Sequence, residues 1–146
     1  MAKKANNKFA DIGLLLLRIG IGGMFIYHGW PKIAGGASGW ESLGQSVSAL
    51  SIPFGFLFWG FILACAEFFG GIFLICGAFI RPFCLLLCGD MIVGAAMHLR
   101  NGAGLPAAAY PIEMGIVFLS LVFIGAGEFT FTNMIEGMKK KVKKKK

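Results

Sequence analysis

Residues 12–30 read IGLLLLRIGIGGMFIYHGW, an apolar run interrupted by a single basic residue, Arg18. A helix needs about 20 mostly apolar residues to cross the hydrocarbon core of a bilayer. This run is near that length, so we expect a membrane-spanning helix. A charge inside a membrane is costly and usually faces a partner or a cavity. Arg18 is therefore a first candidate for function.

Three further apolar segments of similar length follow, at residues 54–78, 82–99 and 107–126. Each carries one acidic side chain, and in chain order these are Glu67, Asp90 and Glu113. The chain is 57% hydrophobic and 14% charged, with a mean hydropathy of +0.76, outside the usual range of soluble domains. We therefore expect an all-α protein, an integral membrane four-helix bundle.

The length leaves room for one bundle and no additional soluble domain. We expect residues 1–11 to form a cytoplasmic N-terminal segment, residues 12–127 the transmembrane domain, and residues 128–146 a lysine-rich cytoplasmic tail. No A-x-A-like cleavage site follows a short apolar stretch at the start, so the first span is expected to be retained.

Basic residues are concentrated on one side of the predicted spans. Of the 14 lysines and arginines, 11 precede the first span, lie between the second and third spans, or end the chain. They are Lys3, Lys4, Lys8, Arg81, Lys139, Lys140, Lys141, Lys143, Lys144, Lys145 and Lys146. The positive-inside rule then places both termini in the cytoplasm. An anionic inner leaflet explains the C-terminal lysines more simply than nucleic acid does, so we predict that they bind lipid.

The first outer loop, residues 31–53, has helical character of its own. Apolar residues recur at helical spacing between serines, at Trp40, Leu43, Val47 and Leu50. Ser38 and Glu41 have the spacing of a capping box. We expect a short amphipathic helix here, which either lies on the outer membrane surface or packs as a lid over the bundle.

The interior charges are expected to pair with one another. From a helix rise of about 1.5 Å per residue, Arg18 lies ~9 Å deep, Asp90 ~12 Å and Glu67 ~17 Å from the cytoplasmic side. Depth favours an Arg18–Asp90 pair, and the long stem of Arg18 also allows a pair with Glu67. Either pair avoids an isolated buried charge, and either can serve as a structural ion pair or as a proton relay.

A second polar group is predicted at the outer rim, where five side chains fall at similar depth. They are His28, Lys32, His98, Tyr110 and Glu113. Such a set can hydrogen-bond a quinone or another polar head, relay protons, or simply anchor the helices at the interface. With Glu67, these are our candidates for a ligand or proton site. Two histidines and a carboxylate can also bind a transition metal, although we assign no metal site.

Four cysteines lie within the second and third spans: Cys65, Cys76, Cys84 and Cys88. No C-x-x-C is present, which excludes a thioredoxin-like motif, and no C-x-x-C-H is present for haem attachment. Cys84 and Cys88 share one helix face. Apolar packing is the favoured interpretation, and a redox pair or a soft-metal site is the alternative. Walker, Rossmann and HExxH patterns are also absent.

Several motifs together resemble the DoxX family of small bacterial membrane proteins. They are RIGIGGMFIYHGWPK at residues 18–32, AEFFGG at 66–71, Gly77, Arg81, His98, YPIE at 110–113 and GAG at 125–127. The resemblance covers about residues 11–127 and implies a four-helix bundle in the bacterial cytoplasmic membrane. The family pattern favours Glu67 as the partner of Arg18, while Asp90 and the lysine tail lie outside that pattern.

Relatives in this family are associated with respiratory or thiol redox systems. The resemblance therefore implies a redox-associated membrane subunit, quinone-linked or thiol/sulfur-linked, with a polar site at the outer rim. Quinone is the cofactor it suggests, and a redox enzyme the partner, alongside the lipid bilayer and a second copy of the chain. Two alternatives are a non-enzymatic membrane adaptor for an oxidoreductase and a small carrier or detoxification protein.

Overall fold

The computed structural model of the chain describes residues 8–136. Its elements are α1 (Lys8–Ala34), α2 (Gly36–Gly44), the 3-10 helix η1 (Gln45–Leu50), α3 (Phe56–Cys76), α4 (Ile80–Arg100) and α5 (Gly104–Ile124). Residues 131–136 are also helical. By length and composition, α1, α3, α4 and α5 are each able to cross a membrane. The prediction of an all-α four-helix membrane bundle is confirmed. The predicted lipid-binding lysines from Lys139 onward lie outside the described residues.

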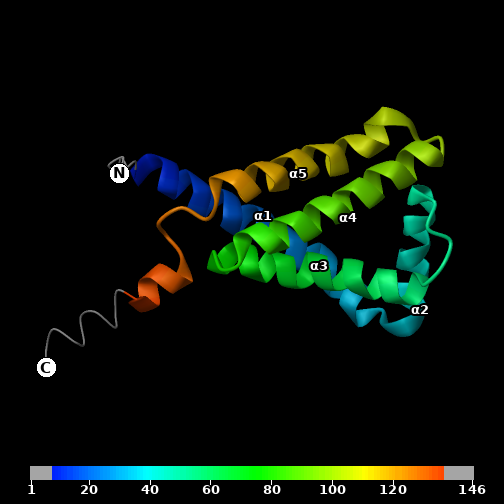
Figure 1. Cartoon of the computed structure of the whole chain (residues 1–146), viewed down its shortest axis with the longest axis horizontal. Helices are drawn as coiled ribbons and strands as arrows, with labels where there is room; N and C mark the ends of the chain where they lie inside the picture. Colours follow the sequence, from blue (N-terminus) through cyan, green and yellow to red (C-terminus); the bar gives the residue numbers. More distant parts are fainter. Residues whose placement is uncertain (1–7, 137–146) are drawn as a thin grey trace, which may run out of the picture.

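The four long helices run back and forth, so both ends of the described chain lie at the same end of the bundle (Figure 1). We call this the terminal end; it also carries the turn between α3 and α4. The opposite end, with α2, η1 and the turn between α4 and α5, is called the loop end. Each connection reverses the direction of the chain, so after four spans the chain returns to the end at which it began.

The turn at the terminal end shows why α3 and α4 form a tight hairpin. Gly77 adopts a left-handed conformation with φ of 68°, and its N–H donates to the carbonyl of Leu74. Glycine takes this conformation without a Cβ clash and is therefore the usual residue just after a helix. Phe79 is also left-handed, and Pro82 falls in the first turn of α4, where proline is tolerated. α3 and α4 are therefore joined by a tight helical hairpin.

One apolar core joins all four spans. Phe25 of α1 meets Phe118 of α5 edge to face, with ring centroids 4.9 Å apart. Leu74 of α3 and Leu87 of α4 are completely buried in the same cluster. A smaller apolar cluster at the loop end joins η1, α3 and α4. The bundle interior is therefore packed with apolar side chains, and the polar side chains described below interrupt it at defined positions.

Glycines allow α1 and α3 to approach at backbone distance. A Cβ added to Gly22 would lie 2.6 Å from the carbonyl oxygen of Gly71, and one added to Gly29 would lie 2.6 Å from the backbone nitrogen of Phe68. Membrane helices associate through such small-residue contacts, because lipid provides no hydrophobic drive between helices. These contacts fix the register of α1 against α3, and hence the depth of every polar side chain on α1.

The predicted loop helix is confirmed as α2, but its start is not the predicted capping box. α2 begins at Gly36 after Gly35, without a side-chain cap, so Ser38 already lies inside the helix. α2 packs along the half of α3 nearest the loop end, where a Cβ on Gly60 would clash with the carbonyl of Trp40. η1 then contacts α4, and Arg100 Nη1 donates to the carbonyls of Ser48 and Ala49. α2 and η1 thus pack beside α3 and α4 at the loop end of the bundle.

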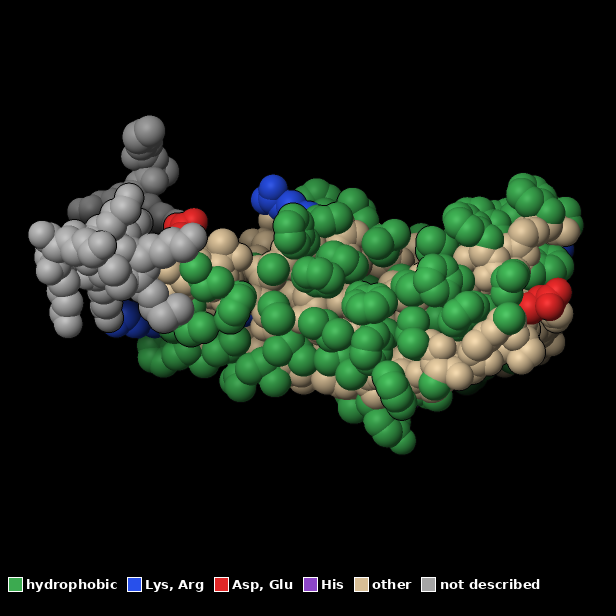
Figure 2. All heavy atoms as spheres, turned by 90° about the horizontal axis from the view of Figure 1, so that it is seen from below, with side chains coloured by type: hydrophobic (Ala, Val, Ile, Leu, Met, Phe, Trp, Pro, Cys, Tyr) green, Lys and Arg blue, Asp and Glu red, His purple; other side chains and the backbone are tan. Residues whose placement is uncertain are grey.

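The outer surface matches a membrane environment. Figure 2 shows that hydrophobic side chains dominate the middle of the visible face, while charged groups lie toward its ends. Among the apolar side chains on the outside, Leu16 is 66% exposed and Phe123 is 77% exposed. A surface of this kind is stable in hydrocarbon and would aggregate in water. The protein is therefore a multi-pass membrane protein.

Candidate functional site

Arg18 does not form either of its predicted ion pairs. Its side chain is completely buried, and its Nη2 donates to the backbone carbonyl of Phe129, just beyond α5. Its Nη1 lies against Gly77, the residue that ends α3. Glu67 is ten residues earlier on α3, about 15 Å away along the helix. The predicted pairing was wrong because α1 begins at Lys8 and Arg18 lies level with the last residue of α3.

The partner of Glu67 is Lys32, from the other end of α1. The Lys32 Nζ lies 2.5 Å from the Glu67 Oε1. The Glu67 side chain is 6% exposed, and that of Lys32 is 34% exposed. Gly29, one turn before Lys32, rests on the backbone of Glu67 and Phe68. This close approach is what lets the lysine stem turn inward to the carboxylate instead of outward to the membrane surface.

Asp90 of α4 completes a group of three charges in the bundle interior. The residue is 7% exposed, and its carboxyl group is adjacent to that of Glu67, within hydrogen-bonding range if one of them carries a proton. Lys32 is close enough to act on Asp90 electrostatically. Without a proton between them, Glu67 Oε2 and Asp90 Oδ2 are buried and lack a hydrogen-bond donor among the described residues.

Tyr110 of α5 brings the fourth span to this cluster. It is within electrostatic range of both Glu67 and Asp90, and the residue as a whole is 52% exposed. Each of the four spans thus contributes one polar side chain. We call Lys32, Glu67, Asp90 and Tyr110 the central cluster. Two carboxyl groups face one ammonium group here, so the cluster is balanced only when it holds one additional proton or cation.

The rim residues predicted to converge do not all join this cluster. His28 is exposed, and its ring packs against that of Tyr27 at a centroid distance of 5.4 Å. Glu113 is exposed on α5, and His98 is half-buried near the end of α4. No group of three or more His, Cys, Asp or Glu side chains suited to a metal ion occurs within residues 8–136. Of the predicted rim set, Lys32 and Tyr110 are the members that reach the interior carboxylates.

The cysteines pack as apolar side chains rather than as a pair. All four are free thiols. Cys84 is completely buried in the main core, and Cys88 packs against that core with its Sγ 3.7 Å from the carbonyl oxygen of Gly115. Burial among apolar side chains suits the small, soft thiol. The i, i+4 spacing of these two residues therefore reflects the buried face of α4.

Comparison with known proteins places this architecture in a family. The sequence profile of the DoxX family matches residues 13–100. The chain belongs to the DoxX family. No curated protein and no solved structure gives a significant match. In this DoxX-family protein, the matched residues span α1 to α4 and include three members of the central cluster, Lys32, Glu67 and Asp90, while Tyr110 follows the matched stretch.

Lys32, Glu67 and Tyr110 were among the predicted candidates for a ligand or proton site, whereas Asp90 was predicted only as an ion-pair candidate. Lys32 was expected to remain with the rim residues, because lysines near span ends usually extend to the interface. Asp90 and Glu67 were alternative expected partners of Arg18, with Asp90 favoured by depth. The signal for the observed grouping lies in Gly29, which shares one face of α1 with Lys32 through i, i+3 spacing and allows a close approach to the helix that carries Glu67.

Proposed function

We propose that this DoxX-family protein is a redox-associated membrane subunit, quinone-linked or thiol/sulfur-linked, whose central cluster binds a polar headgroup and supplies it with a proton. The observation that carries the proposal is the juxtaposition of two buried carboxyl groups, Glu67 and Asp90, with the single ammonium group of Lys32. Ionisable residues inside a membrane usually serve binding or proton transfer, because their burial is otherwise unfavourable.

The donor set suits a quinone headgroup. Lys32 and Tyr110 are the partly exposed members, and each offers a hydrogen-bond donor to a carbonyl oxygen. Glu67 and Asp90 lie behind them and can hold the proton that the charge balance of the cluster requires. Reduction of a quinone held here would require two electrons from a partner oxidoreductase and two protons, one held by the carboxyl pair and one taken up from water. In this chain, Lys32 and Tyr110 orient the headgroup, and the carboxyl pair holds a proton beside it.

Access from the bilayer supports a membrane-dissolved substrate. Glu67 and Asp90 are only 5% and 7% exposed, whereas Tyr110 is half-exposed on the outer surface of α5. A ligand that diffuses within the bilayer can therefore approach from the side, past Tyr110. The concentration of basic residues at the terminal end supports a cytoplasmic location for both termini, in a bacterial cytoplasmic membrane.

The test is quinone retention by the purified protein. Wild-type protein and the variants Lys32→Met, Glu67→Gln and Asp90→Asn are extracted in mild detergent, supplied with a short-chain ubiquinone, and analysed for bound quinone after gel filtration. Glu41→Gln is the matched control, since it removes an exposed carboxylate of α2. We expect the three cluster variants to lose most of the quinone and the control to retain it. Equal retention by all variants would refute the proposal.

Two further outcomes separate the competing functions. Loss of quinone in His28→Ala with retention in Lys32→Met would place the site at the rim and overturn the role of the central cluster. An oxidoreductase that co-purifies equally with wild-type and Glu67→Gln protein, without bound quinone, would instead support the adaptor function. In that case the charged cluster would orient the helices, and the redox chemistry would belong to the partner.

A further inference from the structure

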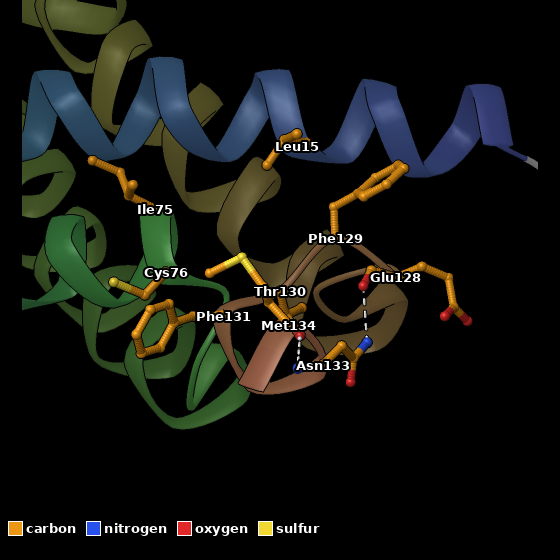
Figure 3. Close-up of a pocket in the computed structure, with 9 residues that line it drawn as sticks. All are labelled: Leu15, Ile75, Cys76, Glu128, Phe129, Thr130, Phe131, Asn133 and Met134. Atoms are coloured by element: carbon orange, nitrogen blue, oxygen red, sulfur yellow. Dashed lines mark hydrogen bonds between the residues drawn. The ribbon is translucent and has the colours of Figure 1, made fainter. Parts of the chain in front are cut away.

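We infer that the terminal end carries a second, separate site, which binds an anionic phospholipid with its phosphate toward Arg18 and an acyl chain in the adjacent cavity. The cavity has a volume of about 610 Å³ and lies between α1, the end of α3 and the segment that follows α5 (Figure 3). Its apolar lining comes mainly from Leu15, Ile75, Phe129, Phe131 and Met134. This site is far from the central cluster and independent of the proposed quinone site.

The buried guanidinium supplies the anion-binding chemistry. Arg18 is 0% exposed, yet its Nε and Nη1 have no hydrogen-bond acceptor within the described residues. Its Nη2 donates to the neutral carbonyl of Phe129, and within residues 8–136 no acidic side chain forms an ion pair with Arg18. An arginine remains charged under all physiological conditions, so an anion would both accept from the free nitrogens and balance the charge. Phosphate oxygens match the fork geometry of a guanidinium well.

Residues that contact or adjoin the Arg18 guanidinium also line the cavity. Phe129 and Thr130 both line the cavity, and the Thr130 side chain shares with Arg18 Nη1 the space beside Gly77. Cys76 lines the cavity too and is within electrostatic range of Arg18. The Thr130 side chain is thus shared between the cavity lining and the surroundings of the unpartnered Arg18 Nη1. The apolar cavity and the cation thus form one amphiphilic site.

The local charge favours a lipid anion as the occupant. The helical residues 131–136 that border the cavity are followed in the sequence by seven lysines. Clusters of lysine beside a membrane attract anionic lipids. Arg18 lies beside Gly77 at the end of the α3 span, and lipid headgroups begin where a span ends. We therefore choose an anionic phospholipid over a free fatty acid.

The test is native mass spectrometry of the full-length protein in detergent, titrated with phosphatidylglycerol and, in parallel, with phosphatidylcholine or oleate. We expect wild-type protein to retain phosphatidylglycerol in preference to the other two lipids. Arg18→Gln should weaken this retention by about tenfold or more, because it removes a charge-assisted hydrogen-bond donor. Leu15→Trp, which fills the cavity and leaves Arg18 in place, should weaken it similarly.

The control is Leu16→Trp, which makes the same change at a neighbouring, 66% exposed position and keeps the lysine tail. It should bind like the wild type. Equal phosphatidylglycerol binding by Leu15→Trp and Leu16→Trp would overturn the inference, since binding would then reside in the tail alone. Preferential retention of oleate would likewise overturn it, because the occupant would be a free fatty acid. If Arg18→Gln fails to fold, the comparison of Leu15→Trp with Leu16→Trp still tests the inference.

Discussion

Lys32 and Glu67 form an ion pair that joins the last turn of α1 to the middle of α3, with 2.5 Å between Nζ and Oε1. The pair combines a deeply buried carboxylate with a lysine whose side chain is one-third exposed. Two consequences follow. The pair holds α1 at a fixed depth against α3, and it places the only cation of the central cluster beside Glu67 and Asp90.

Removing the cation of this pair should cost more than removing its carboxylate. Lys32→Met leaves Glu67 and Asp90 buried without a cation, whereas Glu67→Gln leaves one carboxylate, Asp90, for the one ammonium group. Breaking a fully buried pair costs about 3–5 kcal/mol, and the exposure of Lys32 reduces this to about 1–3 kcal/mol. Thermal unfolding in detergent of both single variants and of the double variant measures the coupling. Strictly additive effects would show that the two side chains do not interact.

The sequence predicts the spans of this protein well and the pairing between them poorly. Hydropathy is a local property, so the four helices and their approximate limits follow directly from the apolar runs. The partner of Arg18 depends instead on the position of α1 along the axis of α3. That register is set where Gly22 meets Gly71 and where Gly29 meets Phe68, contacts that no local pattern reveals. In the observed register, Arg18 lies beside Gly77 at the end of α3, about 15 Å along the helix from Glu67.

The sequence also does not reveal which polar residues of the spans face the bundle interior. Lys32 and Tyr110 are predicted as site candidates because polar side chains inside spans are rare, and both lie beside the interior carboxylates. His28 satisfies the same criterion, yet its ring lies on the outside against Tyr27, since its face of α1 points away from the bundle. Orientation around the helix axis separates these cases, and it requires knowledge of which face of α1 contacts α3.

One contact between α1 and the segment after α5 involves a carboxylate and can be tested separately. The backbone N–H of Glu128 donates to Asp11 Oδ1 at 2.9 Å. Asp11→Ala removes this acceptor and should raise amide hydrogen exchange at Glu128 and in the residues that follow. Asp11→Asn keeps an oxygen at the same place and should preserve most of the protection. Equal exchange in the two variants would show that the contact does not hold the segment.

The turn from α1 into α2 depends on Trp40, whose indole Nε1 donates to the carbonyl of Lys32 at 3.0 Å. Trp40→Phe keeps an aromatic ring and removes the donor. We expect a loss of about 1 kcal/mol in stability, typical for one hydrogen bond. Trp30→Phe is the control, because Trp30 is 59% exposed on α1. Thermal unfolding of the two variants in the same detergent compares them, and an equal effect would assign the loss to ring size alone.

The neighbouring glycines Gly22 and Gly23 offer the sharpest test of the α1–α3 contact. A Cβ on Gly22 would lie 2.6 Å from the carbonyl oxygen of Gly71 and 2.8 Å from the Ile75 side chain, whereas a Cβ on Gly23 meets nothing within 4 Å. Gly22→Ala must therefore push the two helices apart, at a cost of about 1–3 kcal/mol for overpacking. Gly23→Ala should be neutral or stabilise the protein by up to about 1 kcal/mol, because alanine favours the helix.

The same pair of variants also tests whether helix register controls the central cluster. Separation of α1 from α3 by Gly22→Ala should lengthen the distance between Lys32 and Glu67, so quinone retention should fall together with thermal stability. Gly23→Ala should leave both unchanged or slightly improved. Loss of stability without any loss of quinone would show that the ligand does not depend on the Lys32–Glu67 pair, and equal behaviour of the two variants would contradict the close approach itself.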